Sequence, residues 1–248
     1  MSELSKYFDH YTIQAQFMPA FFSVLPYILT MIAWCPNAKS IIGGALTILI
    51  SFGVMAFISS LISNYGNKRQ EKLYKLWGAA PSTLILRHSN QVLSKYTKAR
   101  YHKWLNNHIA DFKMPSLEEE KNDPEDADQK YSSACDYFRE FTRDKKKFSK
   151  VYHDLVAYGF ARNLLSIQKF GLFIAVLSAV INAYFILPFV QGEGTNIIGS
   201  VSINLYGIGT GIVSVIFLLA FLFIVNEDFV KERAFRYVRS LYETCEIN

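Results

Sequence analysis

The chain has 248 residues, a formal net charge of +5, a mean hydropathy of +0.13 and 51% apolar residues. This length allows one or two domains, and the mean hydropathy is high for a soluble protein. Three widely spaced cysteines give neither a disulfide framework nor a zinc pattern, and no cleavable signal peptide is evident.

Four apolar stretches are long enough to cross the hydrocarbon core of a bilayer, which takes about 20 residues. They cover residues 17–34, 40–63, 170–190 and 202–225. None contains Asp, Glu, Lys, Arg or His, and a buried helix of a soluble protein is seldom this long and uncharged. The sequence therefore predicts an all-α integral membrane protein with four transmembrane helices in two hairpins.

The charges between the hairpins predict the orientation. Residues 64–169 hold 20 basic and 13 acidic side chains, a net of 20 − 13 = +7, whereas the two short connections hold only Lys39 and Glu193. Because basic loops stay in the cytoplasm, residues 64–169 are expected to form a helical cytoplasmic domain. The segments 1–16 and 226–248 are then a cytoplasmic N-terminus and a cytoplasmic amphipathic tail.

Local signals subdivide the cytoplasmic domain. Gly78–Pro81 is expected to end a first helix, and Ser82 and Thr83 are expected to cap the next one. Residues 118–128 contain seven acids, one lysine and a proline, which predicts a mobile acidic surface loop.

Aromatic residues after this acidic stretch follow a helical spacing. Phe138, Phe141 and Phe148 lie near one face, which predicts one long helix that continues into the third span. Gly159 and Gly171 are the expected breaks in that helix.

Basic and aromatic residues alternate in the same domain, for example Arg100, Tyr101, Lys103 and Trp104. Aromatic rings beside a cationic groove bind nucleotides or single-stranded nucleic acid. The alternative is that the basic residues face solvent or anionic lipid and the aromatic residues form core.

No catalytic motif is present, and the histidines His102 and His108 are spaced so that they fall on different helix faces. We therefore expect no enzyme. A membrane enzyme would have to use His102, His108 and Asp111.

Small and hydroxyl residues recur within the spans. Gly207 and Gly211 form a GxxxG motif that favours close helix packing or oligomerisation. The hydroxyl groups are candidates for a pore lining: Thr47, Ser51, Thr210 and Ser214.

The segment GNKRQEKLYKLWGAAPSTLILR, residues 66–87, resembles the juxtamembrane stretch of multi-span membrane effectors encoded beside nucleotidyltransferases in bacterial anti-phage defence, and those of Hailong systems are the nearest. The resemblance implies an oligomeric ion channel of the bacterial inner membrane, with a tetramer as the expected assembly. It implies no cofactor. It also implies that a nucleotide or short DNA oligomer made by the partner nucleotidyltransferase binds the basic domain, and that the open channel depolarises the membrane. The residues expected to contact this ligand are Lys72, Lys75, Trp77, Arg87, Arg100, Lys103 and Arg139.

The residues leave a second function open. The spans could be a non-conducting anchor or scaffold whose basic domain recruits a soluble partner.

Overall fold

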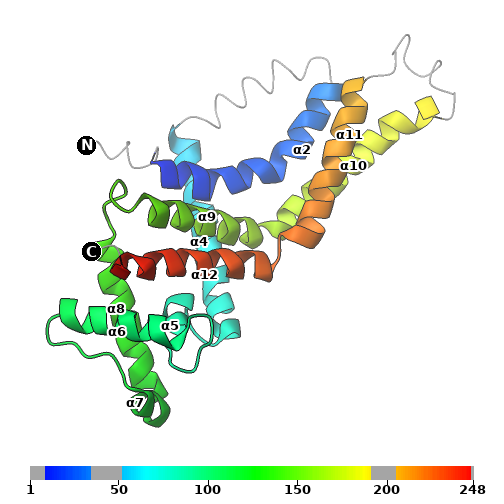
Figure 1. The fold of residues 1–248 in the computed structure, drawn as a ribbon. Helices are drawn as coiled ribbons and strands as arrows, with labels where there is room; N and C mark the ends of the chain where they lie inside the picture. The colour runs from blue at the N-terminus through cyan, green and yellow to red at the C-terminus, as the bar shows by residue number, and fades with distance from the viewer. Residues whose placement is uncertain (1–8, 35–51, 191–204, 247–248) are drawn as a thin grey trace. The chain divides into compact units, whose positions relative to one another are not determined.

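The structure is a computed structural model that describes residues 9–34, 52–190 and 205–246, and every regular element in these ranges is a helix (Figure 1). The elements in chain order are η1 (Thr12–Phe17), α2 (Met18–Trp34), α4 (Phe52–Trp77), α5 (Pro81–Leu86), α6 (Lys95–His108), α7 (Leu117–Asn122), α8 (Pro124–Phe141), α9 (Ser149–Ser166), α10 (Gln168–Val190), α11 (Leu205–Leu219), η2 (Ala220–Ile224), α12 (Glu227–Glu243) and η3 (Thr244–Glu246). They belong to two compact units. The first unit comprises Met1–Arg69 and Gly159–Val230, and the second comprises Gln70–Tyr158 and Lys231–Asn248.

Three helical stretches are long and apolar enough to cross a membrane, namely Thr12–Trp34, Gln168–Leu187 and Leu205–Ile224. They coincide with three of the four predicted spans. The predicted span 40–63 lies largely outside the described residues, which resume at Phe52 with α4. The prediction of an all-helical chain is thus confirmed for the described residues, and three helices could cross a membrane. The count of four spans and the hairpin layout stay predictions.

In the first unit α10 packs against α2 and α11, which also contact each other. Aromatic rings fill the contacts: Trp34 stacks on Phe185 with centroids 5.0 Å apart, and Phe22 lies 6.5 Å from Phe217. The outward side chains are apolar as well, with Phe173 63% and Ile216 56% exposed. Apolar groups on the outside of a helix group are the expected surface toward lipid.

The core of the second unit is built by α6, α8 and the end of α12. Leu105, Phe138 and Tyr242 are fully buried, and the Tyr242 hydroxyl donates a hydrogen bond of 3.2 Å to the carbonyl of Ser82. Phe138 meets Tyr242 edge-on at 5.0 Å. These contacts join residues far apart in the sequence, as a hydrophobic core requires.

The prediction of a mobile acidic loop over residues 118–128 is wrong, because this stretch forms α7 and the start of α8. Ser116 and Glu119 form a reciprocal capping box on α7. Asp123 caps α8 by accepting from the backbone N–H of Asp126 at 3.0 Å. Acidic residues in a first helical turn are stabilised by the helix dipole, so these acids are helix-start signals.

The predicted long helix is interrupted elsewhere than expected. Helix α8 ends at Phe141, and the turn that follows is held by Asp144, whose carboxylate accepts from the backbone N–H groups of Lys146 and Lys147. A second interruption falls at Ile167 between α9 and α10. The expected breaks Gly159 and Gly171 instead lie inside helices, where they permit close contacts.

The turn between α4 and α5 is only partly as predicted. Helix α4 ends at Trp77, and Gly78 has a φ of 90°, a conformation that favours glycine. The cap prediction is wrong, because Ala80 is the N-cap of α5 and Ser82 and Thr83 are buried inside the helix. Pro81 occupies the first turn, where its missing N–H is tolerated, so α5 begins before Ser82 and not after Thr83.

Candidate functional site

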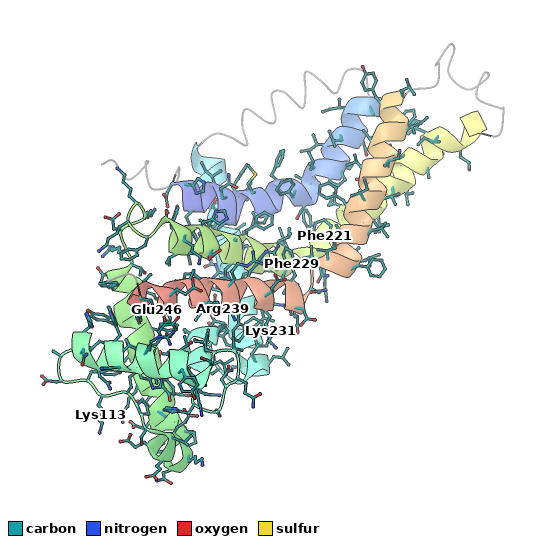
Figure 2. All side chains as sticks on the ribbon, viewed as in Figure 1. Lys113, Phe221, Phe229, Lys231, Arg239 and Glu246 are labelled. Carbon is teal, nitrogen blue, oxygen red and sulfur yellow. The ribbon has the colours of Figure 1, made fainter. Side chains whose placement is uncertain are left out.

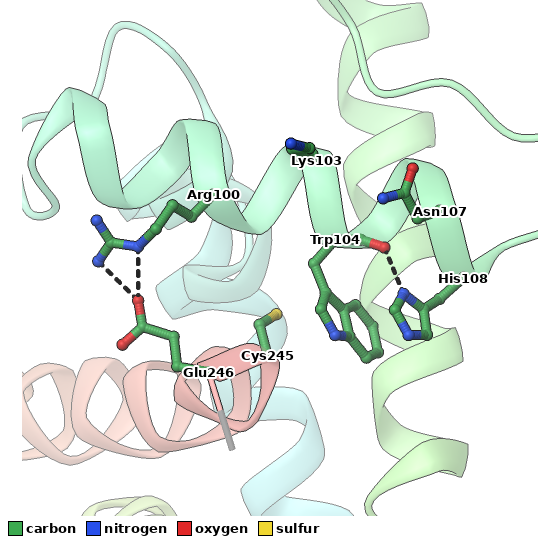
Figure 3. A pocket seen from close by; sticks show the side chains of 7 residues that line it. All are labelled: Arg100, Lys103, Trp104, Asn107, His108, Cys245 and Glu246. Carbon is green, nitrogen blue, oxygen red and sulfur yellow. Dashed lines mark hydrogen bonds and ion pairs between the residues drawn. The ribbon is translucent and has the colours of Figure 1, made fainter. Parts of the chain in front are cut away.

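Two of the predicted ligand contacts, Arg100 and Lys103, line one hollow of about 570 Å³ in the second unit (Figure 3). Both project from α6, and η3 forms the opposite side. The remaining lining residues are Trp104, Asn107, His108, Cys245 and Glu246. The hollow is shallow and open, so a ligand would be held against a surface and not enclosed.

Aromatic rings form the floor of this hollow. The imidazole of His108 stacks on Trp104 with centroids 3.7 Å apart and an interplanar angle of 10°, and Trp104 stacks on Phe138 at 5.1 Å. His108 is further held by a 2.8 Å hydrogen bond between its Nδ1 and the carbonyl of Trp104 (Figure 3). Such flat rings beside cations offer a stacking surface for a planar group.

An intramolecular carboxylate occupies the basic side of the hollow. Arg100 donates from Nε and Nη2 to one oxygen of Glu246, at 3.0 and 2.7 Å. The Arg100 side chain is 58% exposed and that of Glu246 is 45% exposed. Exposed ion pairs contribute only about 0–1 kcal/mol, so an external anion can replace this carboxylate at small cost.

A second hollow of about 600 Å³ lies on the other side of this ion pair, and Arg100 and Glu246 belong to both. Its lining is completed by residues from the turn before α6, from α6 and from α12: Val92, Leu93, Ser94, Thr97, Tyr101, Arg239 and Glu243. Figure 2 labels Arg239 of α12 and Glu246 of η3. The Arg100–Glu246 pair therefore separates two open hollows along one helix.

Two groups of the lining, the Cys245 thiol and the Tyr101 hydroxyl, stay protonated near neutral pH. Burial raises the pKa of the Cys245 thiol to about 12. Burial also raises the pKa of Tyr101 to about 12, with nearby Glu246 adding to the effect. A thiol that stays protonated is a weak nucleophile, so the arrangement suits binding better than covalent chemistry.

The other five predicted ligand contacts lie away from these two hollows. Lys72 and Lys75 are exposed on α4, and Trp77 ends that helix, with its ring 6.1 Å from Tyr74. Arg87 forms an ion pair with Asp128, and Arg139 pairs with Asp136 at 3.0 Å. The predicted residues thus do not form one cluster.

A buried polar cluster in the second unit was not anticipated from the sequence. Lys98 is 4% exposed, and its ammonium group donates to the carbonyls of Arg87, His88 and Asn90. Glu120 accepts from the hydroxyl of Tyr131 at 2.6 Å, and from the backbone N–H groups of His88 and Ser89 at 2.7 and 3.1 Å. This cluster holds the turn between α5 and α6.

The pKa values in this cluster follow from burial and hydrogen bonding. Burial lowers the pKa of His102 to about 4, with His88 acting in the same direction. Burial acts to raise the pKa of Glu120, but the hydrogen bonds from Tyr131, His88 and Ser89 outweigh it and lower that pKa. At neutral pH the cluster therefore holds a neutral His102 and an ionised Glu120.

A second polar centre lies between the three candidate spans of the first unit. Asn182 of α10 is 1% exposed. Its amide oxygen accepts from Trp34 Nε1 at 2.9 Å and from the Thr210 hydroxyl at 2.8 Å, and its amide nitrogen donates to Thr30 and Ser214 at 2.8 and 3.3 Å. One side chain thus connects α2, α10 and α11.

Four of the predicted pore or packing residues belong to the described part of the chain, and all four lie at this polar centre. Thr210 and Ser214 bond to Asn182, Gly207 packs against Trp34, and Gly211 lies against Asn182 and Ile186. In this chain the four residues occupy helix contacts. Thr47 and Ser51 lie outside the described residues.

The absence of charged residues, which predicts the spans, gives no indication of Asn182. An asparagine in an otherwise apolar stretch was the available signal, since a polar side chain inside a membrane needs a partner. Lys98 had no such signal, because its burial depends on carbonyls that only the folded turn brings together. His102 is buried and His108 exposed, and no group of metal-ligating side chains occurs within the described residues.

The chain matches no protein family, no curated protein and no solved structure. The resemblance to anti-phage membrane effectors therefore stays a prediction.

Proposed function

We propose that the chain is a homo-oligomeric membrane channel that is gated by a nucleotide or a short DNA oligomer bound to the second unit. The observation that carries this proposal is the hollow in which Arg100 and Lys103 stand beside the stacked Trp104 and His108. The cations would hold phosphate groups and the rings would hold a base. Stacking of one base on an aromatic side chain contributes about 1–3 kcal/mol.

The membrane part of the proposal draws on the first unit, which has three helices able to span a bilayer. By the resemblance, the setting would be the bacterial inner membrane with cytoplasmic termini, the source of the ligand a partner nucleotidyltransferase, and the assembly a tetramer. Opening would depolarise the membrane of an infected cell. No enzymatic step is proposed for this chain.

The experiment is ligand binding by the full-length protein in detergent across a salt series. The probes are labelled short single-stranded DNA and a panel of cyclic nucleotides. Binding is expected to weaken as salt rises, because phosphate contacts release counterions. Lys103→Glu is expected to reduce affinity at least tenfold, because it reverses one charge in the hollow.

Arg143→Glu is the matched control, because it makes the same change of charge at an exposed site that pairs with Glu140 outside both hollows. Equal loss of affinity in the two variants would assign binding to general charge and contradict the site. Failure of every probe to bind would remove the proposed ligand class.

One observation favours the alternative of a non-conducting anchor. The hydroxyl groups of Thr210 and Ser214, which were candidates for a pore lining, bond to Asn182 at a helix contact. Replacing the spans by an unrelated multi-span anchor should preserve function if they only hold position. Loss of function in that chimera would exclude the anchor.

A further inference from the structure

Two of the candidate spans contain a π-helical segment at one end. The segment η1 precedes α2, and η2 follows α11. A π-helix accommodates one residue more per turn than an α-helix, is rare, and changes the backbone hydrogen-bond pattern locally. Backbone carbonyls in both segments consequently lack an α-helical donor.

In η2 the carbonyl of Phe221 loses its backbone donors. An α-helix would give it the N–H of Val225, but that N–H donates to Ala220 at 3.0 Å. The next N–H, of Asn226, donates to Ile224 at 2.9 Å. The side-chain amide of Gln168 takes their place, donating from Nε2 to the Phe221 carbonyl at 2.8 Å.

In η1 the carbonyl of Ala15 lacks its α-helical donor for a different reason. Its α-helical donor would be the N–H of residue 19, which is a proline and has none. The side-chain amide of Asn163 donates to this carbonyl at 2.6 Å. Asn163 is fully buried.

A glycine lies close to each amide donor and to the same π-helical segment. A Cβ atom on Gly171 would come within 2.4 Å of the Phe221 ring, and one on Gly159 would come within 3.0 Å of Ala15. Gly171 follows Gln168 by three residues, and Gly159 precedes Asn163 by four, so each pair shares a helix face. Figure 2 shows Phe221 where α11 meets the start of α10.

The two segments differ in one respect. Pro19 can never supply an N–H, so α2 cannot recover the α-helical bond to Ala15. In η2 the corresponding α-helical hydrogen bond can be recovered, because the N–H of Val225 can return to the Phe221 carbonyl if the hydrogen bond from Gln168 is absent.

We infer that Gln168 is a positioning residue that selects between two registers of α11. With the Gln168–Phe221 hydrogen bond, η2 stays π-helical and Thr210 and Ser214 face Asn182. Without it η2 becomes α-helical, and α11 turns by one residue, about 100°, relative to Val225. Asn163 holds α2 in a single register. This inference holds whether the protein conducts ions or only anchors a partner.

The test measures the register of α11 by cross-linking in the full-length protein. The reporter pair is Ile186→Cys with Gly211→Cys, because a Cβ on Gly211 would lie 3.3 Å from the end of Ile186. The native cysteines are replaced by alanine. The control pair is Phe22→Cys with Phe160→Cys. The rings of the native Phe22 and Phe160 lie 6.1 Å apart, and this pair does not involve α11.

In this background Gln168→Met should reduce the yield of the reporter cross-link at least threefold and leave the control pair unchanged. Deletion of Leu222, an exposed residue of η2, should restore the reporter yield. The reason is that removing the extra residue makes the segment α-helical without turning α11. An unchanged reporter yield in Gln168→Met, or a reduced yield that the deletion leaves unrestored, would overturn the inference.

A second measurement covers the case in which Gln168→Met fails to fold. Deletion of Leu222 in the chain with native Gln168 should leave the reporter yield as it is. Deletion of Val180, an exposed residue of the regular helix α10 that precedes the reporter Ile186, should reduce it. Equal effects of the two deletions would show that η2 is not the site of an inserted residue and would overturn the inference.

Discussion

The indole N–H of Trp34 donates to the amide oxygen of Asn182 across 2.9 Å, and this bond joins α2 to α10. Trp34 also stacks on Phe185 at 5.0 Å and covers Gly207 of α11. The three candidate spans therefore meet at one polar and aromatic contact.

Removal of the Asn182 amide should loosen this contact. Individual side-chain hydrogen bonds between membrane helices contribute about 0.6 kcal/mol on average and at most about 1.7 kcal/mol. Asn182→Leu breaks several and should lower the free energy of unfolding by about 1–3 kcal/mol. The measurement is thermal unfolding in detergent, with Leu187→Ala on the exposed face of α10 as the control. Equal stability of Asn182→Leu and native protein would contradict this assignment.

Gly171 should not tolerate a methyl group, because a Cβ there would approach the Phe221 ring to 2.4 Å. Gly171→Ala is expected to destabilise the protein by about 1–3 kcal/mol through overpacking. Gly209→Ala is a matched control, since a Cβ at Gly209 has no atom within 4 Å. Unfolding measurements on Gly171→Ala with and without Phe221→Leu test the cause. If Phe221→Leu does not recover the loss, the close contact is not the reason.

Glu120 should be required for the second unit, because it accepts hydrogen bonds from Tyr131, His88 and Ser89 while buried. Glu120→Gln removes the charge that strengthens these bonds and should cost about 1.5–3 kcal/mol. Glu118→Gln on the exposed face of α7 should cost little. Chemical denaturation of the two variants would compare them directly, and similar midpoints would contradict the role of Glu120.

Stability should fall as pH decreases from about 6.5 to about 4. The pKa of His102 is lowered to about 4 by burial, whereas in the unfolded chain it is near its ordinary value of about 6.5. Between these values the unfolded state binds a proton that the folded state does not, so acid favours unfolding. The melting temperature measured across this range should lose part of its slope in His102→Gln. An unchanged slope would show that His102 is not the group responsible.

How far the sequence predicted the structure can be judged from particular residues. The spans at Thr12–Trp34, Gln168–Leu187 and Leu205–Ile224 were predictable because the absence of charge over such a length is a property of the sequence itself. The composition of the acidic stretch predicts a loop, whereas its N-cap residues, Ser116 and Asp123, predict two helix starts, and the caps decide the structure.

The candidate site could be predicted only in part. Arg100 and Lys103 are three residues apart on one helix, so local spacing places them together. The partner of Arg100, Glu246, is 146 residues away, and no pattern in the sequence connects the two. The same holds for Asn182 and for Gln168, whose partners come from other helices and are set by tertiary packing.

Ion flux from liposomes tests the central claim most directly. Purified full-length protein is reconstituted with entrapped potassium, and efflux is recorded with and without short single-stranded DNA and each cyclic nucleotide. A ligand-gated channel predicts efflux that changes on addition of at least one ligand, in either direction. The change should be reduced in Lys103→Glu and retained in Arg143→Glu. Liposomes that stay ion-tight under every ligand condition would contradict the channel and leave the anchor as the function of the spans.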